Sequence, residues 1–143
     1  MENSDQEKRF LAIDYGAKRI GIAITDPLMM FAYPLVTLAN DGAFWSNFQK
    51  ILSEYNVVKI ILGYPLKESG EESKSSKMVL DFRDILEKKV KIPIELVDER
   101  YSSEIAKQRI LESVVSKKKR RDKSLLDKNA ASVILQDYLS SLQ

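Results

Sequence analysis

The chain has 143 residues, 44% of them hydrophobic, which suits one globular domain with a buried core and is too short for two domains of usual size. It contains no cysteine and no histidine. This excludes disulfides, thiolate or imidazole catalysis and the usual zinc sites. The formal net charge is only +2, so any strongly charged surface must be local. Catalysis here would need carboxylates, Lys, Tyr, Ser, or a metal held by oxygen.

The N-terminal residues 1–9 are polar and charged, and we expect them to form a tail ahead of a single domain over residues 10–143. They lack the apolar segment of a secretion signal. No apolar run approaches the roughly 18 residues that a membrane span requires. The sequence therefore predicts a cytoplasmic protein without a membrane partner.

Two strands open the predicted domain, the first over residues 10–16 and the second over residues 19–25. In the first strand Phe10, Ala12 and Asp14 share one face, because side chains alternate between the two faces of a strand. Asp14 thus continues a buried face to the strand end, where Gly16 lets the backbone turn. An aspartate at this place is also an ordinary turn residue that binds its own hairpin, and this alternative stays open.

Strands and helices then alternate along the chain, which is typical of an α/β sheet with parallel strands. Pro34 suggests that the third strand lies at an edge or contains a bulge. The loop after the fourth strand should leave the sheet at the end where Asp14 lies, which is where α/β sheets bind ligands. The expected elements are a strand at 31–38, a helix at 43–55, a buried parallel strand at 57–62, a loop at 63–73, a helix at 73–89 and a strand at 92–97.

The C-terminal third holds a helix with apolar residues from Ile105 to Val114, a basic loop over 116–123, and a last helix from about Ser124. Residues 101–123 carry eight basic side chains against three acidic ones, which favours phosphate or another anionic surface as partner. On the last helix Asp127 lies on the predicted inward stripe. It could also be a helix cap. The other residues of this stripe are Ala130, Ala131, Ile134 and Tyr138.

Three carboxylates from distant places could meet at one sheet edge: Asp14 at the end of the first strand, Glu99 after the last, and Asp127 at a helix start. Like charges gathered in this way need a cation. Without His or Cys, oxygen ligands point to Mg²⁺ or Mn²⁺. Such a site suits phosphodiester hydrolysis, with hydroxide generated by one metal and the leaving oxygen stabilised by a second. The basic loop could hold a polynucleotide beside it.

An ordered set of motifs resembles the YqgF family of RuvC-like, ribonuclease H-fold proteins. The resemblance extends from about Phe10 to Leu142. It implies an α/β fold with a mixed five-stranded sheet, in which antiparallel opening strands are followed by parallel ones, and with helices on both faces. The motifs are Ile13-Asp14-Tyr15-Gly16 with Arg19-Ile20-Gly21, Gly63-Tyr64-Pro65-Leu66 with Gly70, Asp98-Glu99-Arg100-Tyr101-Ser102-Ser103, and Asp127-Lys128-Asn129-Ala130-Ala131.

Carried over residue by residue, the resemblance implies that Asp14, Glu99 and Asp127 are the catalytic, metal-binding acids. Asp98 is the less favoured alternative to Glu99, because adjacent strand residues point to opposite faces. Phosphate would be held by Lys18, Arg19 and Arg100, and Gly63 and Pro65 would shape the loop across the site. Substrate would also contact the basic segment Lys117, Lys118, Lys119, Arg120 and Arg121.

Two positions depart from the pattern. RuvC-type junction resolvases carry a fourth acid one helical turn after the third, where this chain has Ala130. This weakens a resolvase assignment and leaves three acids that can still hold metal. Met29 stands where many family members have glycine.

The function implied is a metal-dependent endonuclease that processes the 5′ end of the 16S ribosomal RNA precursor. The alternatives are a Holliday junction resolvase acting on branched DNA, and a nucleic-acid-binding module without catalysis. A nucleotide-binding protein of the actin and hexokinase type ranks last, because 143 residues leave little room for its second domain. The sequence leaves open one or two metals, and a monomer or a weak homodimer.

Overall fold

Five strands form one mixed sheet in the computed structural model, which describes residues 7–65, 69–98 and 123–142. The strand order is β3-β2-β1-β4-β5. β1 pairs with β2 and β2 with β3 antiparallel, whereas β4 lies parallel to both β1 and β5. The predicted sheet, antiparallel first and then parallel, is confirmed. The strands are β1 (Lys8–Tyr15), β2 (Arg19–Thr25), β3 (Ala32–Ala39), β4 (Asn56–Tyr64) and β5 (Ile94–Asp98).

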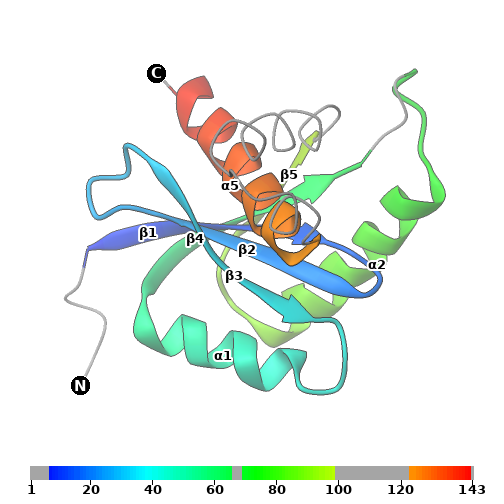
Figure 1. Ribbon diagram of the computed structural model, residues 1–143, viewed down its shortest axis with the longest axis horizontal. Coiled ribbons are helices and arrows are strands. Elements are labelled where there is room, and N and C mark those ends of the chain that lie inside the picture. The colour runs from blue at the N-terminus through cyan, green and yellow to red at the C-terminus, as the bar shows by residue number, and fades with distance from the viewer. Residues whose placement is uncertain (1–6, 66–68, 99–122, 143) are drawn as a thin grey trace.

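Helices cover both faces of this sheet (Figure 1). α1 (Phe44–Glu54) and α2 (Lys74–Lys89) pack on one face, and α5 (Lys123–Ser141) crosses the other. None of the helices in the described ranges is long and apolar enough to cross a membrane.

The alternation of side chains along each strand explains the two layers of core. In β1, Leu11 and Ile13 are fully buried against the α1 and α2 side, whereas Ala12 is buried against α5. Ala23 and Ala131 join Ala12 in the α5 layer. These small side chains let α5 approach the sheet closely at Ala131.

The edge strand β3 contains the irregularity that Pro34 predicts. Its register with β2 shifts between Ile22 and Ala23, where Val36 pairs with Ile22 and Pro34 with Ala23. Proline has no N–H to donate to a strand ladder, so it fits an edge and a bulge. Both parts of the prediction are confirmed.

Element boundaries differ from the sequence predictions by one or two residues in most elements, including β4, which runs two residues into the predicted 63–73 loop. β1 begins at Lys8, so the last two residues of the predicted 1–9 tail belong to the sheet, where Lys8 pairs with Asn56. α5 begins at Lys123, the last residue of the predicted basic loop. The remainder of that loop and the helix expected around 105–114 lie outside the described residues. Ser73 is the N-cap of α2 and forms a capping box with Ser76.

Candidate active site

The C-terminal ends of β1, β4 and β5 meet at one edge of the sheet, because these three strands are parallel. Asp14 is the second-last residue of β1, and Tyr64 and Asp98 end β4 and β5 as a register pair. The prediction that these strand ends share one edge is confirmed.

Asp14 lies on the sheet face that α5 covers. Its neighbours Ile13 and Tyr15 both pack into the core on the α1 and α2 side, so the half-buried Asp14 side chain points the other way. Across the sheet Asp14 pairs with Gly21 on β2, and Gly63 on β4 follows Leu62, the partner of Ile13. Both glycines are buried. The carboxylate therefore stands between two strand positions that contribute no side chain.

Gly16 fixes the turn that follows Asp14. A Cβ at this position would lie 2.5 Å from the carbonyl oxygen of Arg19, closer than real contacts allow. From the end of β3, Asn40 holds the same turn: its Nδ2 donates to the Gly16 carbonyl (2.9 Å) and its backbone N–H to the Lys18 carbonyl (3.0 Å). Lys18 is exposed and Arg19 half-buried, so two basic side chains follow Asp14 within one braced turn.

The alternation of β5 bears on the choice between Asp98 and Glu99. Ile94 and Leu96 pack on the α1 and α2 side, whereas Val97 packs on the α5 side and Glu95 binds Tyr138 of α5. Asp98 thus belongs to the series that faces away from α5. Glu99 follows the last residue of β5 and lies outside the described residues, so the choice of Glu99 over Asp98 stays a prediction.

Among the other predicted site residues, Asp14 and Gly63 lie on neighbouring strands on the same face, and Pro65 directly follows β4. The Pro65 carbonyl accepts a hydrogen bond from Ser73 Oγ at the start of α2 (3.1 Å). Asp127 lies in α5, though its side chain is not among those described. No group of three potential metal ligands occurs among the described residues, which include one of the three predicted acids with its side chain. Outside them lie Glu99, Arg100, Lys117, Lys118, Lys119, Arg120 and Arg121.

A polar cluster that we did not predict ties α5 to the sheet. Lys59 Nζ donates to the hydroxyl of Tyr138, which in turn donates to Glu95 Oε1 (3.0 Å), and Lys59 pairs with Glu95 at 3.0 Å. The hydrogen bond that Lys59 donates to Tyr138, followed by the hydrogen bond with Glu95, raises the pKa of Lys59. Lys59, followed by Tyr138, lowers the pKa of Glu95. The one sequence feature that could have predicted this cluster is Lys59, a charged residue inside the otherwise apolar run of β4.

The predicted inward stripe of α5 is confirmed where it is described. Ala130, Ala131, Ile134 and Tyr138 are all buried, at 6% exposure or less. Asp127 lies one turn before Ala130 and Ala131 in the sequence, and its place beside Asp14 stays a prediction.

A family model for "RuvX: Holliday junction resolvase" matches residues 8–141, nearly the whole chain. The chain belongs to the RuvX family. The predicted YqgF resemblance is thereby confirmed, and with it membership of a nuclease family.

RuvX relatives share about two fifths of the sequence. A protein of Dictyoglomus turgidum is 41% identical over 94% of this chain and 95% of its own length, and one of Phocaeicola vulgatus is 40% identical over 93% and 96%. Both carry the name "Putative pre-16S rRNA nuclease".

Solved structures show where the RuvX fold belongs. RuvC of Thermus thermophilus, solved in complex with a Holliday junction substrate, superposes with a TM-score of 0.59 at 11% identity, covering 95% of this chain and 96% of RuvC. The fowlpox virus Holliday junction resolvase gives 0.53 at 17% identity, covering 94% and 99%. These likenesses show a ribonuclease H-like fold.

Proposed function

We propose that this RuvX-family chain is a divalent-metal-dependent endonuclease that processes the 5′ end of the 16S ribosomal RNA precursor in the cytoplasm. The observation that carries the proposal is the position of Asp14. It stands at the end of β1 on the α5 face, flanked by Gly21 and Gly63. The relatives of about 40% identity that bear the pre-16S name match over more than nine tenths of both chains.

The residues present fit a magnesium or manganese ion. Asp14 offers hard oxygen ligands beside two glycine positions, and Glu99 and Asp127 would complete the set. Two observations on described residues support these partners: Val97, two positions before Glu99, packs on the α5 side of β5, and Ala130 and Ala131, one turn after Asp127, are buried. Such an ion, when bound, supplies a nucleophile from water and stabilises the leaving oxygen.

The side chains around Asp14 would bind and orient the substrate. Lys18 and Arg19 follow Asp14 in the turn that Asn40 braces, and they would hold a phosphate next to the carboxylate. Gly63 and Pro65 would shape the loop beside the same carboxylate. Arg100 and the segment 117–121 would extend the contact along the polynucleotide backbone.

Cleavage of branched DNA is the second candidate, because the family model describes a Holliday junction resolvase and RuvC shares the fold. Ala130 stands against it. This residue occupies the place where RuvC-type resolvases are expected to carry a fourth acid, and its side chain is 2% exposed.

The test compares cleavage of a 5′-extended 16S rRNA precursor with cleavage of a four-way DNA junction, each with and without Mg²⁺ or Mn²⁺. We expect metal-dependent cleavage of the RNA. Asp14→Asn, Glu99→Gln and Asp127→Asn should each lower the rate at least about 100-fold, about 2.7 kcal/mol of transition-state stabilisation, with an unchanged circular dichroism spectrum.

Asp98→Asn is the matched control, since it removes one carboxylate at the same strand end from the series that faces away from α5. It should cleave nearly as well as the wild type. A fully active Asp14→Asn protein would refute the assigned site, and cleavage of the junction alone would favour the resolvase. Salt-sensitive RNA binding without cleavage in the presence of either metal would favour a nucleic-acid-binding module without catalysis.

A further inference from the structure

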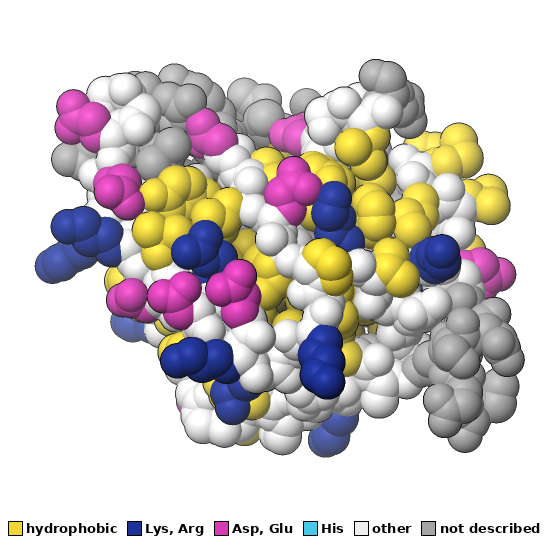
Figure 2. Space-filling model, turned by 180° about the vertical axis from the view of Figure 1, so that it is seen from behind, with side chains coloured by type: hydrophobic (Ala, Val, Ile, Leu, Met, Phe, Trp, Pro, Cys, Tyr) yellow, Lys and Arg dark blue, Asp and Glu magenta, His cyan; other side chains and the backbone are white. Residues whose placement is uncertain are grey.

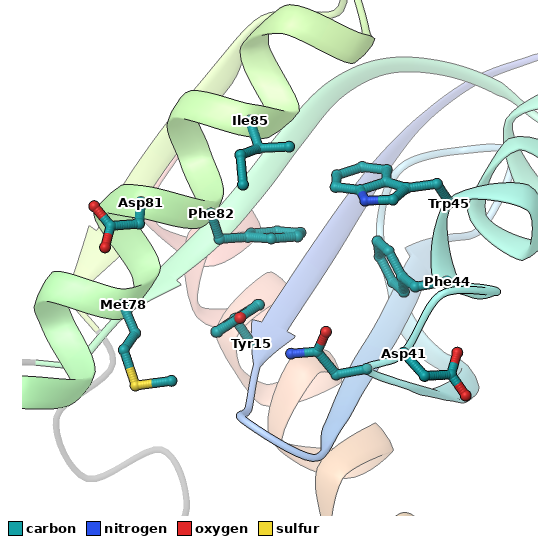
Figure 3. A pocket seen from close by; sticks show the side chains of 9 residues that line it. Tyr15, Asp41, Phe44, Trp45, Met78, Asp81, Phe82 and Ile85 are labelled. Atoms are coloured by element: carbon teal, nitrogen blue, oxygen red, sulfur yellow. The ribbon is translucent and has the colours of Figure 1, made fainter.

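An aromatic cavity of about 210 Å³ opens on the face of the sheet opposite to α5. It lies between the start of α1 and the middle of α2, and its rings come from Tyr15, Phe44, Trp45 and Phe82 (Figure 3). Tyr15 follows Asp14 in β1 but points to the opposite face. A ligand in this cavity would therefore leave the α5 face and its carboxylate accessible.

The rings pack closely and form one aromatic surface. The ring centroid of Phe82 lies 4.5 Å from that of Tyr15 and 5.6 Å from that of Trp45. The ring planes of Phe82 and Trp45 are inclined to each other by only 18°. The faces of such rings carry negative partial charge and attract cations. The protein already uses this property, because Lys89 Nζ lies 5.1 Å from the centroid of the Trp45 ring.

Two carboxylates stand at the mouth of the cavity. Asp41 comes from the turn before α1, where its Oδ1 accepts a hydrogen bond from the backbone N–H of Ala43 (2.9 Å), and the exposed Asp81 comes from α2. Within the described ranges neither carboxylate has a basic side chain within salt-bridge distance. Met78 and Ile85 of α2 add apolar surface, with 37% and 46% exposure.

The same face of the molecule shows apolar side chains at the surface, with acidic and basic side chains around them (Figure 2). Apolar groups left in water on a folded surface are a common feature of binding sites. The ring cluster, the two acids and the apolar rim together restrict the chemistry of a ligand. A polynucleotide backbone would be repelled by Asp41 and Asp81, and a purely apolar ligand would desolvate both carboxylates without a partner.

We propose that this cavity receives an arginine side chain from a basic segment of a partner protein. A guanidinium is a planar cation that stacks on aromatic rings and pairs with carboxylates through a fixed fork of N–H donors. Lysine matches less well, because its compact ammonium is more strongly hydrated and cannot stack. The proposal does not depend on the nuclease function, since the cavity and Asp14 lie on opposite faces.

Trp45 provides the measurement, because it is the single tryptophan of the chain and lines the cavity. The probes are three nine-residue peptides of glycine and serine that carry two arginines, two lysines or two glutamines. We expect the arginine peptide to change the Trp45 fluorescence of the full chain saturably and to bind more weakly as ionic strength rises. The lysine peptide should bind at least about threefold more weakly, and the glutamine peptide should cause no saturable change.

Asp81→Asn tests the carboxylate, and Asp84→Asn is its matched control on the same helix but outside the cavity. Asp81→Asn should weaken the arginine peptide about five- to tenfold, and Asp84→Asn should leave its affinity unchanged. Equal affinity in the two variants would overturn the proposal, as would equal binding of the glutamine peptide. Sedimentation of the protein alone tests whether a second copy of this chain fills the cavity. Self-association that Asp81→Asn abolishes would overturn the partner protein and identify basic residues of a second copy as the occupant.

Discussion

The substitution Tyr138→Phe removes one hydroxyl group from the Lys59, Tyr138 and Glu95 cluster that ties α5 to the sheet. The ring would keep its packing, since it lies edge to face with Phe10 at 6.0 Å and beneath Lys59 at 5.1 Å. Only the hydrogen bond from Lys59 and the one to Glu95 would be lost. The change therefore isolates what these two hydrogen bonds contribute to holding α5 on the sheet.

The expected loss in the free energy of unfolding is about 1 kcal/mol. Hydrogen bonds to charged groups contribute roughly 1.5–3 kcal/mol when their partners are left without an alternative. Here the Lys59 and Glu95 side chains are 30% and 46% exposed and remain paired with each other, so water can replace the hydroxyl. Solvent screening thus puts the effect below this range. For a chain of this length it corresponds to a fall in Tm of about 4 °C.

The pH dependence of this difference follows from the pKa shifts of the two charged partners. The pKa of Lys59 is raised, so its stabilising contribution is complete below the ordinary lysine pKa and is lost as pH rises through the raised value. The pKa of Glu95 is lowered, so its contribution is complete above the ordinary glutamate pKa and is lost as pH falls through the lowered value. The wild type should exceed Tyr138→Phe by a constant amount between about pH 5 and pH 10, and by less outside this range.

Urea unfolding followed by circular dichroism at pH 3, 7 and 11 measures this difference, with Tyr33→Phe as the control. Tyr33 is an exposed tyrosine of β3, and its variant should match the wild type at all three pH values. The reasoning is refuted if Tyr138→Phe is as stable as the wild type at pH 7. A deficit that stays the same at pH 3 and pH 11 would refute the charged partners as its cause.

Two further changes test the turns at either end of the sheet. Gly16→Ala should displace the turn after Asp14, because its Cβ would meet the Arg19 carbonyl at 2.5 Å, and we expect RNA cleavage to fall more than tenfold while thermal unfolding stays cooperative. Unchanged cleavage would show that the turn does not position Asp14. Met29→Gly should stabilise the protein by up to about 1 kcal/mol in urea unfolding, because Met29 has a φ of 57°, a left-handed conformation that suits glycine. A less stable variant would show that the Met29 side chain outweighs this strain.

The sequence predicts much of this fold because its local signals agree with one another. Asp14 falls at a strand end on the face of Phe10 and Ala12, Pro34 marks an edge bulge, and the stripe of α5 is buried as its spacing indicates. The Lys59 cluster escapes prediction because it depends on the register of β4 against β5 and on the position of α5 above both. The aromatic cavity escapes it for a similar reason, since its walls come from β1, α1 and α2, which only the fold brings together.

The order of the elements along the chain also has a consequence for synthesis. α5 follows all five strands, and the hydrogen bond from the Ala32 N–H to Gln136 Oε1 joins residues 104 positions apart. A ribosome therefore releases the whole sheet before the helix that covers its second face, and contacts over such long separations form slowly. Until α5 arrives, the buried face around Ala12, Ala23 and Ile61 lacks its cover. The proposed acid Asp127 arrives with that same helix, so a growing chain that still lacks α5 would have no cutting activity.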